Sequence, residues 1–118
     1  MGRPIHFELQ SKDCEKAQKF YGDLFGWKFQ QFGGHEYWLA MTGEGPGIDG
    51  GLMPSNGLQN WVCTMDVENL DSHMQKVEHA GGTIVVPKMP IPGMGWVAYG
   101  KDLDGNIFGM FQGDSNAA

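Results

Sequence analysis

The feature that most constrains the fold of this chain is an internal repeat. A shift of 56 residues places His6 on Val62, and farther along the chain a shift of 58 residues places Trp38 on Trp96. An insertion of two residues in the longer loop of the second half accounts for the change of offset. A repeat of this length predicts two copies of one supersecondary unit within a common fold.

Each half begins with a short strand, at 5–9 and 61–67, and continues into an amphipathic helix. The helices are expected to begin after Asp13 and Asn69, both good N-cap residues, and to end at glycines 22, 26, 81 and 82. Apolar residues at helical spacing predict one stripe per helix that packs on a sheet. The stripes consist of Ala17, Phe20, Tyr21, Leu24 and Phe25, and of Leu70, Met74 and Val77.

Three strand-like segments follow each helix, at 28–32, 37–41 and 48–53 and again at 83–86, 96–99 and 107–111. A proline-rich loop is predicted at 87–95 and a linker at 54–60. The sequence thus predicts an α+β fold of two tandem βαβββ modules, about 3–54 and 61–113, in a single domain spanning 1–118. The alternative is an unrelated α+β domain in which the matching glycines are accidental.

Composition excludes several classes of partner and location. The 118 residues include 14 acidic and 8 basic side chains, a net charge of −6, without a basic cluster. This argues against nucleic acid or an anionic membrane surface as a partner. No apolar run is long enough to span a membrane, and the first residues lack a secretory leader, so we expect a cytoplasmic location. Cys14 and Cys63 form neither a disulfide framework nor a metal knuckle.

Four motifs give the chain a family resemblance that covers residues 4–112. They are His-Phe-Glu at 6–8, Phe-Tyr-Gly-Asp-Leu-Phe-Gly-Trp at 20–27, Gly-Gly-Leu-Met-Pro at 50–54, and Asp-Leu-Asp-Gly-Asn-Ile-Phe-Gly-Met-Phe at 102–111. The sequence resembles the vicinal oxygen chelate superfamily, which includes glyoxalase I, bleomycin-resistance proteins and extradiol dioxygenases. The resemblance implies that the modules form an open barrel of curved sheets around a ligand cavity, with the helices outside, and it favours a homodimer.

The resemblance also implies a divalent metal held from the first and last strand of each module. Here the corresponding positions read His6, Gly51, Val62 and Gly109. Three of these four residues cannot bind a metal through a side chain, which argues against the usual metal site and its lyase or dioxygenase chemistry.

A different set of side chains offers a possible metal site. Residues two apart in a strand share a face, so Glu8 lies on the face of His6, and Asp49 and Met53 flank Gly51. His6, Glu8 and Asp49 form a conceivable set of one histidine and two carboxylates. The alternative is a polar floor in which His6 and Glu8 bond to each other or to Thr64 and orient a ligand without metal.

The glycines at ligand positions have two interpretations. Gly51 and Gly109 either leave open space for a ligand or relieve a bend in a curved sheet. Met89 and Met94, in the predicted proline-rich loop, are expected to cap the mouth of a cavity, whereas strand alternation turns Met65 and Met110 toward the helices. The predicted ligand-binding residues are His6, Glu8, Asp49, Gly51, Met53, Val62, Thr64, Met89, Met94, Gly109 and Phe111.

Neither cysteine is predicted to act in catalysis. Cys63 is expected to be a buried structural thiol. The helix N-terminus is expected to lower the pKa of Cys14, although no partner for nucleophilic catalysis accompanies it. His35, in a predicted turn, and His73 and His79, in the second helix, are expected at the surface.

Two functions from different classes remain. The first is a small-molecule binding or sequestering domain that lacks the usual metal-ligand set and needs no cofactor. The second is a metal-dependent lyase, isomerase or dioxygenase-type enzyme that uses His6, Glu8 and Asp49. A mainly structural or interaction role is also compatible with the fold.

Overall fold

The computed structural model describes residues 1–55, 57 and 60–118. The chain divides into two compact units, and each consists of one βαβββ module. The N-terminal unit comprises Ile5–Val62, and the C-terminal unit comprises Met1–Pro4 together with Cys63–Ala118. Most of the predicted 54–60 linker is described, but residues 56, 58 and 59 lie outside the described residues. None of the helices among the described residues is long and apolar enough to cross a membrane.

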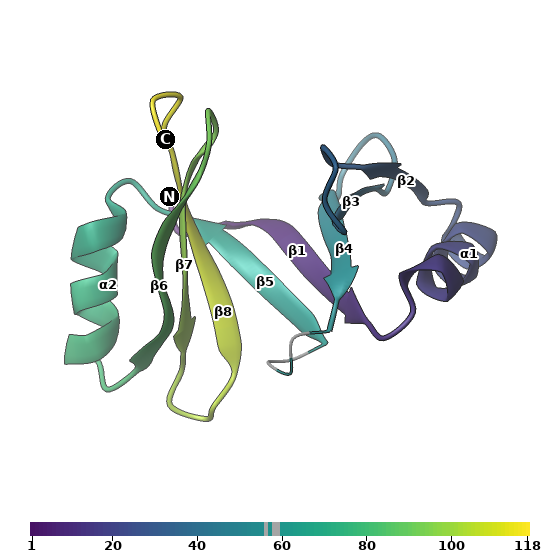
Figure 1. Cartoon of the computed structure of the whole chain (residues 1–118). Coiled ribbons are helices and arrows are strands. Elements are labelled where there is room, and N and C mark those ends of the chain that lie inside the picture. Colours follow the sequence, from purple (N-terminus) through teal and green to yellow (C-terminus); the bar gives the residue numbers. More distant parts are fainter. Residues whose placement is uncertain (56, 58–59) are drawn as a thin grey trace. The chain divides into compact units, whose positions relative to one another are not determined.

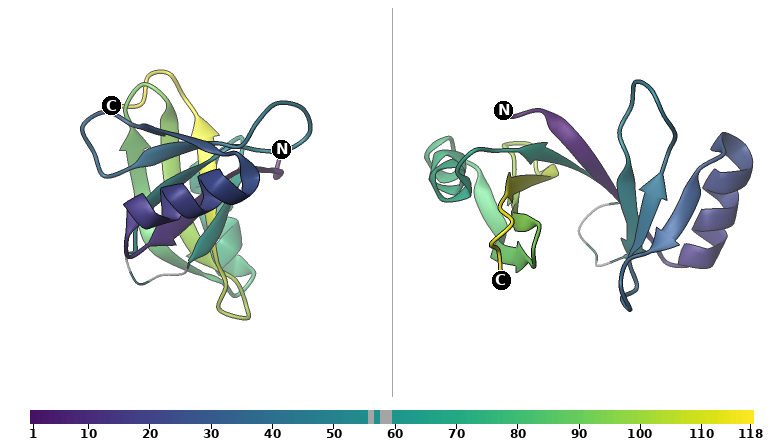
Figure 2. Two further views of the ribbon diagram at one scale, coloured as in Figure 1. Left: turned by 90° about the vertical axis from the view of Figure 1, so that its right-hand side faces the viewer. Right: turned by 90° about the horizontal axis from the view of Figure 1, so that it is seen from above.

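The N-terminal unit has one helix and a four-stranded sheet. Its elements are β1 (Pro4–Ser11), α1 (Cys14–Phe25), β2 (Lys28–Gln31), β3 (Trp38–Met41) and β4 (Gly50–Pro54). The strand order is β2-β3-β4-β1, in which β1 and β4 are parallel and the other pairs are antiparallel. Helix α1 packs on β2 and β4 (Figure 2).

The C-terminal unit repeats this arrangement. Its elements are β5 (Trp61–Asp66), α2 (Leu70–His79), β6 (Thr83–Ile91), β7 (Gly95–Lys101) and β8 (Ile107–Gly113). The strand order is β5-β8-β7-β6, again with one parallel pair, β5 and β8. Figure 1 shows α2 along one face of β6, β7 and β8. The predicted α+β fold of two βαβββ modules is therefore confirmed.

Strand pairing confirms the alignment of the two halves. Glu8 pairs with Gly51 in the first parallel pair, and Thr64 pairs with Gly109 in the second. These pairs are related by the same offsets, 56 and 58, that the sequence shows. Consequently Gly51 and Gly109 occupy matching places in the two sheets.

The predicted helix starts and the end of α1 at Gly26 are confirmed, whereas Gly22 lies inside α1 and α2 ends at Ala80 instead of at a glycine. The side chain of Asp13 accepts a hydrogen bond from the backbone N–H of Lys16, and the side chain of Asn69 accepts one from that of Ser72. Gly26 ends α1 in the left-handed conformation, with φ of 75°. Each cap satisfies a backbone N–H that the first turn of a helix leaves without a partner.

The prediction of a proline-rich loop at 87–95 is wrong for most of its length. Strand β6 continues to Ile91 and pairs with β7 as far as Gly95, through two irregularities of register. Pro87 and Pro90 lie in this strand because β6 is at the outer edge of the order β5-β8-β7-β6. Proline is tolerated at an edge, where a missing N–H breaks no continuous ladder.

The Asp-Leu-Asp-Gly-Asn motif at 102–106 forms the turn between β7 and β8. Asp102 Oδ1 accepts hydrogen bonds from the backbone N–H groups of Asp104 and Asn106, and Gly105 has φ of 89°. These hydrogen bonds hold the pKa of Asp102 below its usual value. The motif therefore has a structural explanation.

Candidate functional site

A cluster of three polar side chains lies on the face of the N-terminal sheet that points away from α1. His6 and Glu8 come from β1, and Tyr37 comes from the residue that precedes β3. The His6 Nε2 atom lies 2.9 Å from the Tyr37 hydroxyl, which donates a longer hydrogen bond of 3.5 Å to Glu8 Oε2. We call these residues the tyrosine cluster.

The Tyr37 hydroxyl has a single proton, which it can donate either to Glu8 or to an unprotonated Nε2 of His6, according to the tautomer of the imidazole. Burial lowers the pKa of His6, although the carboxylates of Glu8 and Asp49 oppose this change. Burial and the charge of Glu8 raise the pKa of Tyr37 well above its usual value. The cluster therefore combines a neutral imidazole with a protonated phenol at neutral pH.

Tyr37 also explains the glycine at position 51. A Cβ atom at this position would overlap the Tyr37 hydroxyl and the ring carbon that bears it. Of the two interpretations of Gly51, open space for a ligand is wrong, because the tyrosine fills that space. The absence of a side chain at position 51 is what allows the hydroxyl to reach His6.

The space beside the matching glycine of the C-terminal unit, Gly109, is also filled by side chains. A Cβ at Gly109 would lie 2.5 Å from Thr64 Oγ1 and 3.3 Å from the ring of Tyr99. Thr64 is 4% exposed. The predicted open space at Gly109 is therefore also wrong. Val62 lies on the same face of β5 as Thr64 by strand alternation, and it is buried. The Phe111 ring of β8 lies over Gly95 of β7 on this face of the sheet.

The residues present do not fit the metal site that the superfamily resemblance implies. A carboxylate at position 51 would collide with Tyr37, and Gly109 and Val62 provide no ligand atom. The remaining position, His6, has its Nε2 atom engaged by the Tyr37 hydroxyl. This hydrogen bond occupies the nitrogen through which His6 would ligate a metal.

The alternative set of His6, Glu8 and Asp49 is not assembled as one metal-ligating group. Across the residues that the structure describes, no three His, Cys, Asp or Glu side chains are grouped to hold a metal ion. Asp49 precedes β4 and is exposed, and its Oδ1 accepts a hydrogen bond of 2.9 Å from the backbone N–H of Thr42. This bond ties Asp49 to the loop between β3 and β4.

The predicted methionines lie in different elements of the two units. Met53 lies in β4, two residues from Gly51, and is partly buried. Met89 lies in β6 opposite Val97 instead of in a loop, and Met94 lies in the tight turn that follows, where its N–H bonds to the carbonyl of Ile91. Met110 packs with Leu70 and Ala98 on the α2 side, as strand alternation predicts.

Both cysteine expectations are wrong. Cys63 is exposed. It lies beside Phe108 on the face of β5 that points toward the α2 side, but α2 packs over β6, β7 and β8. Burial raises the pKa of the Cys14 thiol, and the carboxylates of Glu36 and Asp13 add to the increase. The expected lowering of this pKa is therefore wrong.

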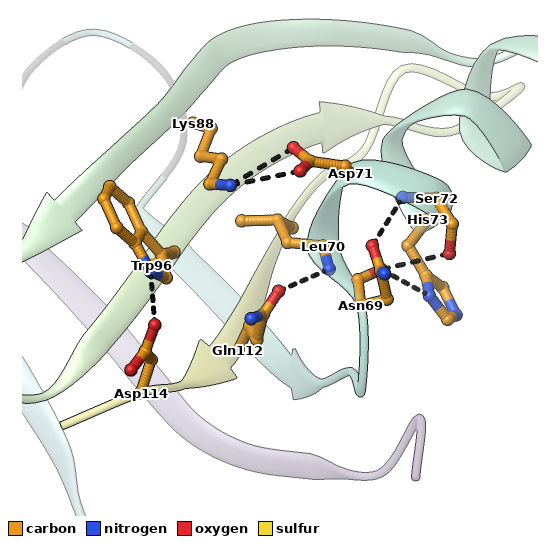
Figure 3. A network of polar contacts seen from close by, with 9 residues as sticks. All are labelled: Asn69, Leu70, Asp71, Ser72, His73, Lys88, Trp96, Gln112 and Asp114. Atoms are coloured by element: carbon orange, nitrogen blue, oxygen red, sulfur yellow. Dashed lines mark hydrogen bonds and ion pairs between the residues drawn. The ribbon is translucent and has the colours of Figure 1, made fainter. Parts of the chain in front are cut away.

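A second polar cluster surrounds the N-terminus of α2 (Figure 3). Lys88 on β6 forms an ion pair of 3.2 Å with Asp71 and lies over the Trp96 ring, whose Nε1 donates to Asp114. Gln112 on β8 accepts from the backbone N–H of Leu70 at 2.8 Å. All these polar groups have partners within the unit, so this cluster fixes α2 on its sheet.

Sequence reasoning placed His6 and Glu8 correctly on one face but missed Tyr37. The available signal was a glycine in one strand with an aromatic residue at the start of the neighbouring strand. In sheets, an aromatic ring often covers a glycine on an adjacent strand. The same relation holds for Gly95 and Phe111, and for Gly100 and Phe108.

Comparisons with known proteins agree with this architecture. Residues 3–42 match the family described as bleomycin resistance protein-like N-terminal. "Putative glyoxylase CFP32" of Mycobacterium tuberculosis is 30% identical over 124 residues, which cover 94% of this chain and 46% of that protein. "Anthracycline biosynthesis protein DnrV" of Streptomyces peucetius is 26% identical and covers 94% of this chain and 47% of that protein. This chain thus spans about half the length of the curated relatives it matches.

A solved structure shows the same fold over the full length. A glyoxalase/bleomycin resistance protein/dioxygenase superfamily member from Vibrio splendidus superposes with a TM-score of 0.68 at 18% identity, covering 97% of this chain and 100% of that one. With the repeated βαβββ modules, this likeness shows that the chain has the fold of the glyoxalase/bleomycin resistance protein/dioxygenase superfamily, and its sequence is similar to proteins named for glyoxalases and bleomycin resistance.

Proposed function

We propose that the chain is a small-molecule binding domain of the glyoxalase/bleomycin resistance fold that holds its ligand without the metal-ligand set of the superfamily. One observation carries this proposal: the Tyr37 hydroxyl occupies the space beside Gly51 and engages His6 Nε2. Tyr37 thereby closes one ligand position and blocks another. The same residues provide hydrogen-bonding groups in place of a metal.

The surroundings of the tyrosine cluster support a role as a polar anchor. Pockets for organic ligands are mostly apolar and contain a few placed polar groups that fix orientation. The register of β3, β4 and β1 puts Leu39 and Met53 on the face that carries His6 and Glu8. A ligand on this face would meet apolar side chains and a small group of hydrogen-bonding atoms.

The names of the relatives suggest the class of ligand. The family that matches residues 3–42 is named after bleomycin resistance, and the Streptomyces relative is named after anthracycline biosynthesis. Both names refer to organic molecules with aromatic rings. We therefore favour a planar aromatic ligand with hydrogen-bonding substituents.

The test is calorimetry and thermal shift with planar aromatic compounds and thiol adducts. We expect a saturable ligand whose affinity falls roughly two- to tenfold in Tyr37→Phe, because one net hydrogen bond is lost. Tyr21→Phe is the matched control, since Tyr21 packs against aromatic rings beside α1. Absence of any ligand, or equal affinity in both variants, would contradict the proposal.

The competing function is a metal-dependent lyase, isomerase or dioxygenase that uses His6, Glu8 and Asp49, which the glyoxylase name of the mycobacterial relative supports. Divalent cations distinguish the two functions. The binding proposal predicts that they leave the melting temperature unchanged. A saturable increase that His6→Ala removes, and that the exposed control His35→Ala retains, would favour the enzyme.

A further inference from the structure

Strand β2 forms the outer edge of the N-terminal sheet. Among the strands that the structure describes, only β3 pairs with it. Their register continues beyond the strand, where the backbone N–H of Phe32 donates to the carbonyl of Tyr37 at 2.8 Å. In an antiparallel pair, residues alternate between those that bond to the neighbouring strand and those that point away from it. Phe29 and Gln31 therefore direct their backbone N–H and C=O groups away from β3, toward the outer edge.

We propose that this edge binds an extended peptide segment of a partner protein, which pairs with β2 as an additional strand. In this mode of recognition, main-chain hydrogen bonds provide affinity and alternate side chains provide specificity. Strand β2 contains no proline, so each of its residues retains a backbone donor. The inference does not depend on the proposed ligand.

The face of β2 that points toward α1 is aromatic. Trp27 and Phe29 are two residues apart and share this face, with ring centroids 6.4 Å apart. Phe25 extends the row, with its ring centroid 6.0 Å from that of Trp27, and it is 62% exposed. Side chains directly opposite each other on neighbouring strands are in contact, so one side chain of the added strand would lie beside Phe29. We therefore expect apolar side chains of the partner on this face.

The opposite face of β2 carries a positive charge. Lys28 and Gln30 alternate with Phe29 along the strand, and both are exposed. Within the part of the chain that the structure describes, Lys28 forms no ion pair. An acidic side chain opposite Lys28 would form a cross-strand ion pair, whereas a basic one would be repelled. The partner segment is therefore expected to alternate apolar with acidic residues.

The test uses two short synthetic peptides that are blocked at both ends. One alternates valine with glutamate, and the other alternates valine with lysine. Fluorescence anisotropy is expected to show saturable binding of the glutamate peptide. The lysine peptide is expected to bind at least about threefold more weakly at low salt, and added salt should reduce the difference, because it screens the charge of Lys28. Amide hydrogen exchange of Phe29 and Gln31 is expected to become slower in the complex.

Two variants at one position separate the backbone from the side chain. Gln31→Pro removes an N–H that points away from β3, so the pairing of β2 with β3 is retained and one donor of the edge is lost. Its affinity for the glutamate peptide is expected to fall roughly tenfold, because the added strand loses a main-chain hydrogen bond. Gln31→Ala is the matched control. It loses the same side chain, including the hydrogen bond to the carbonyl of His35, but keeps the backbone N–H.

Three results would overturn the proposal. They are the absence of saturable binding of the glutamate peptide, equal affinity of the two Gln31 variants, and binding of the lysine peptide that is as tight as that of the glutamate peptide. Far-UV circular dichroism checks that Gln31→Pro is folded. If it is not, N-methylation of the peptide replaces it. Methyl groups on the amides that face β2 are expected to abolish binding to the wild type, whereas methyl groups on the other amides are expected to be tolerated. Equal effects of the two methylation patterns would contradict the pairing.

Discussion

Helices α1 and α2 occupy equivalent places in the repeat but bury their apolar stripes to different extents. In α2, Leu70 is fully buried, and Met74 and Val77 pack against the core formed with Ala98 and Met110. No residue of α1 is buried. The same pattern in sequence therefore gives a helix that completes a core in one unit and a helix that keeps an apolar surface in the other.

The difference shows that an amphipathic pattern predicts an apolar face without determining what covers it. The apolar residues of α1 and α2 have similar helical spacing, and a side chain caps the N-terminus of each helix. The two helices differ in the residues that surround them. Helix α2 is tied to its sheet through Gln112, Asp71 and Lys88, whereas the aromatic rings below α1 already pack against one another.

The largest expected effect comes from truncating one leucine in each helix. Leu70→Ala removes a fully buried side chain and is expected to lower the free energy of unfolding by about 2–5 kcal/mol. Leu24→Ala, at a half-exposed site, is expected to change it by about 0.5 kcal/mol or less in the monomer. Urea denaturation at low protein concentration measures both values. Equal losses would remove the contrast between the helices.

A second prediction concerns the glycine of the tyrosine cluster. Gly51→Ala places a methyl group in the space of the Tyr37 hydroxyl and is expected to lower the free energy of unfolding by about 1–3 kcal/mol. Gly34→Ala is the control, because a Cβ there meets no atom within 4 Å. Adding Tyr37→Ala to Gly51→Ala is expected to cost less than the sum of the single losses. Additive losses in thermal denaturation would show that the two positions are independent.

The two helix caps are expected to contribute equally to the free energy of unfolding, so they provide a further test of the comparison between α1 and α2. Asp13→Ala and Asn69→Ala each remove a side-chain acceptor for a backbone N–H and are each expected to cost about 1 kcal/mol. Gln75→Ala, at an exposed position of α2, controls for loss of a polar side chain. A much larger loss at Asn69 alone would mean that cap strength, rather than packing, distinguishes the two helices.

The smallest expected effect is the pH dependence contributed by His6. Its pKa in the folded state is lowered, so the unfolded state binds the proton more readily. Stability is fully present above the unfolded value of about 6.5 and decreases as the pH falls through it toward the folded value. His6→Gln is expected to make this decrease shallower, whereas His35→Gln should leave it unchanged. Denaturation midpoints over a pH series, with an NMR titration of the ring, measure the effect.

Much of the fold could be predicted from the sequence because the repeat, the caps and the strand alternation are local signals. Asp13, Asn69 and Gly26 were identified from residue type alone, and the pairing of Glu8 with Gly51 follows from the aligned halves. The extension of β6 through Pro87 could not be predicted locally. It depends on the position of that strand at the edge of the sheet.

The candidate site was only partly predictable, since its decisive contact joins two distant segments. His6 and Glu8 share a face by alternation, but Tyr37 reaches them from the residue before β3, 31 positions after His6. Sequence alone therefore left two interpretations of Gly51, open space for a ligand or relief of a bend in the sheet. Likewise, Cys63 was expected to be buried by strand parity, and its exposure depends on which strands α2 covers.

The prolines of β6 affect the ability of the edge of the C-terminal sheet to pair with another strand. An edge strand offers free N–H and C=O groups, and another chain can extend the sheet by pairing with them. Pro87 and Pro90 remove two backbone donors from this edge of the C-terminal sheet. Growth of the sheet by addition of another strand is thereby discouraged at β6.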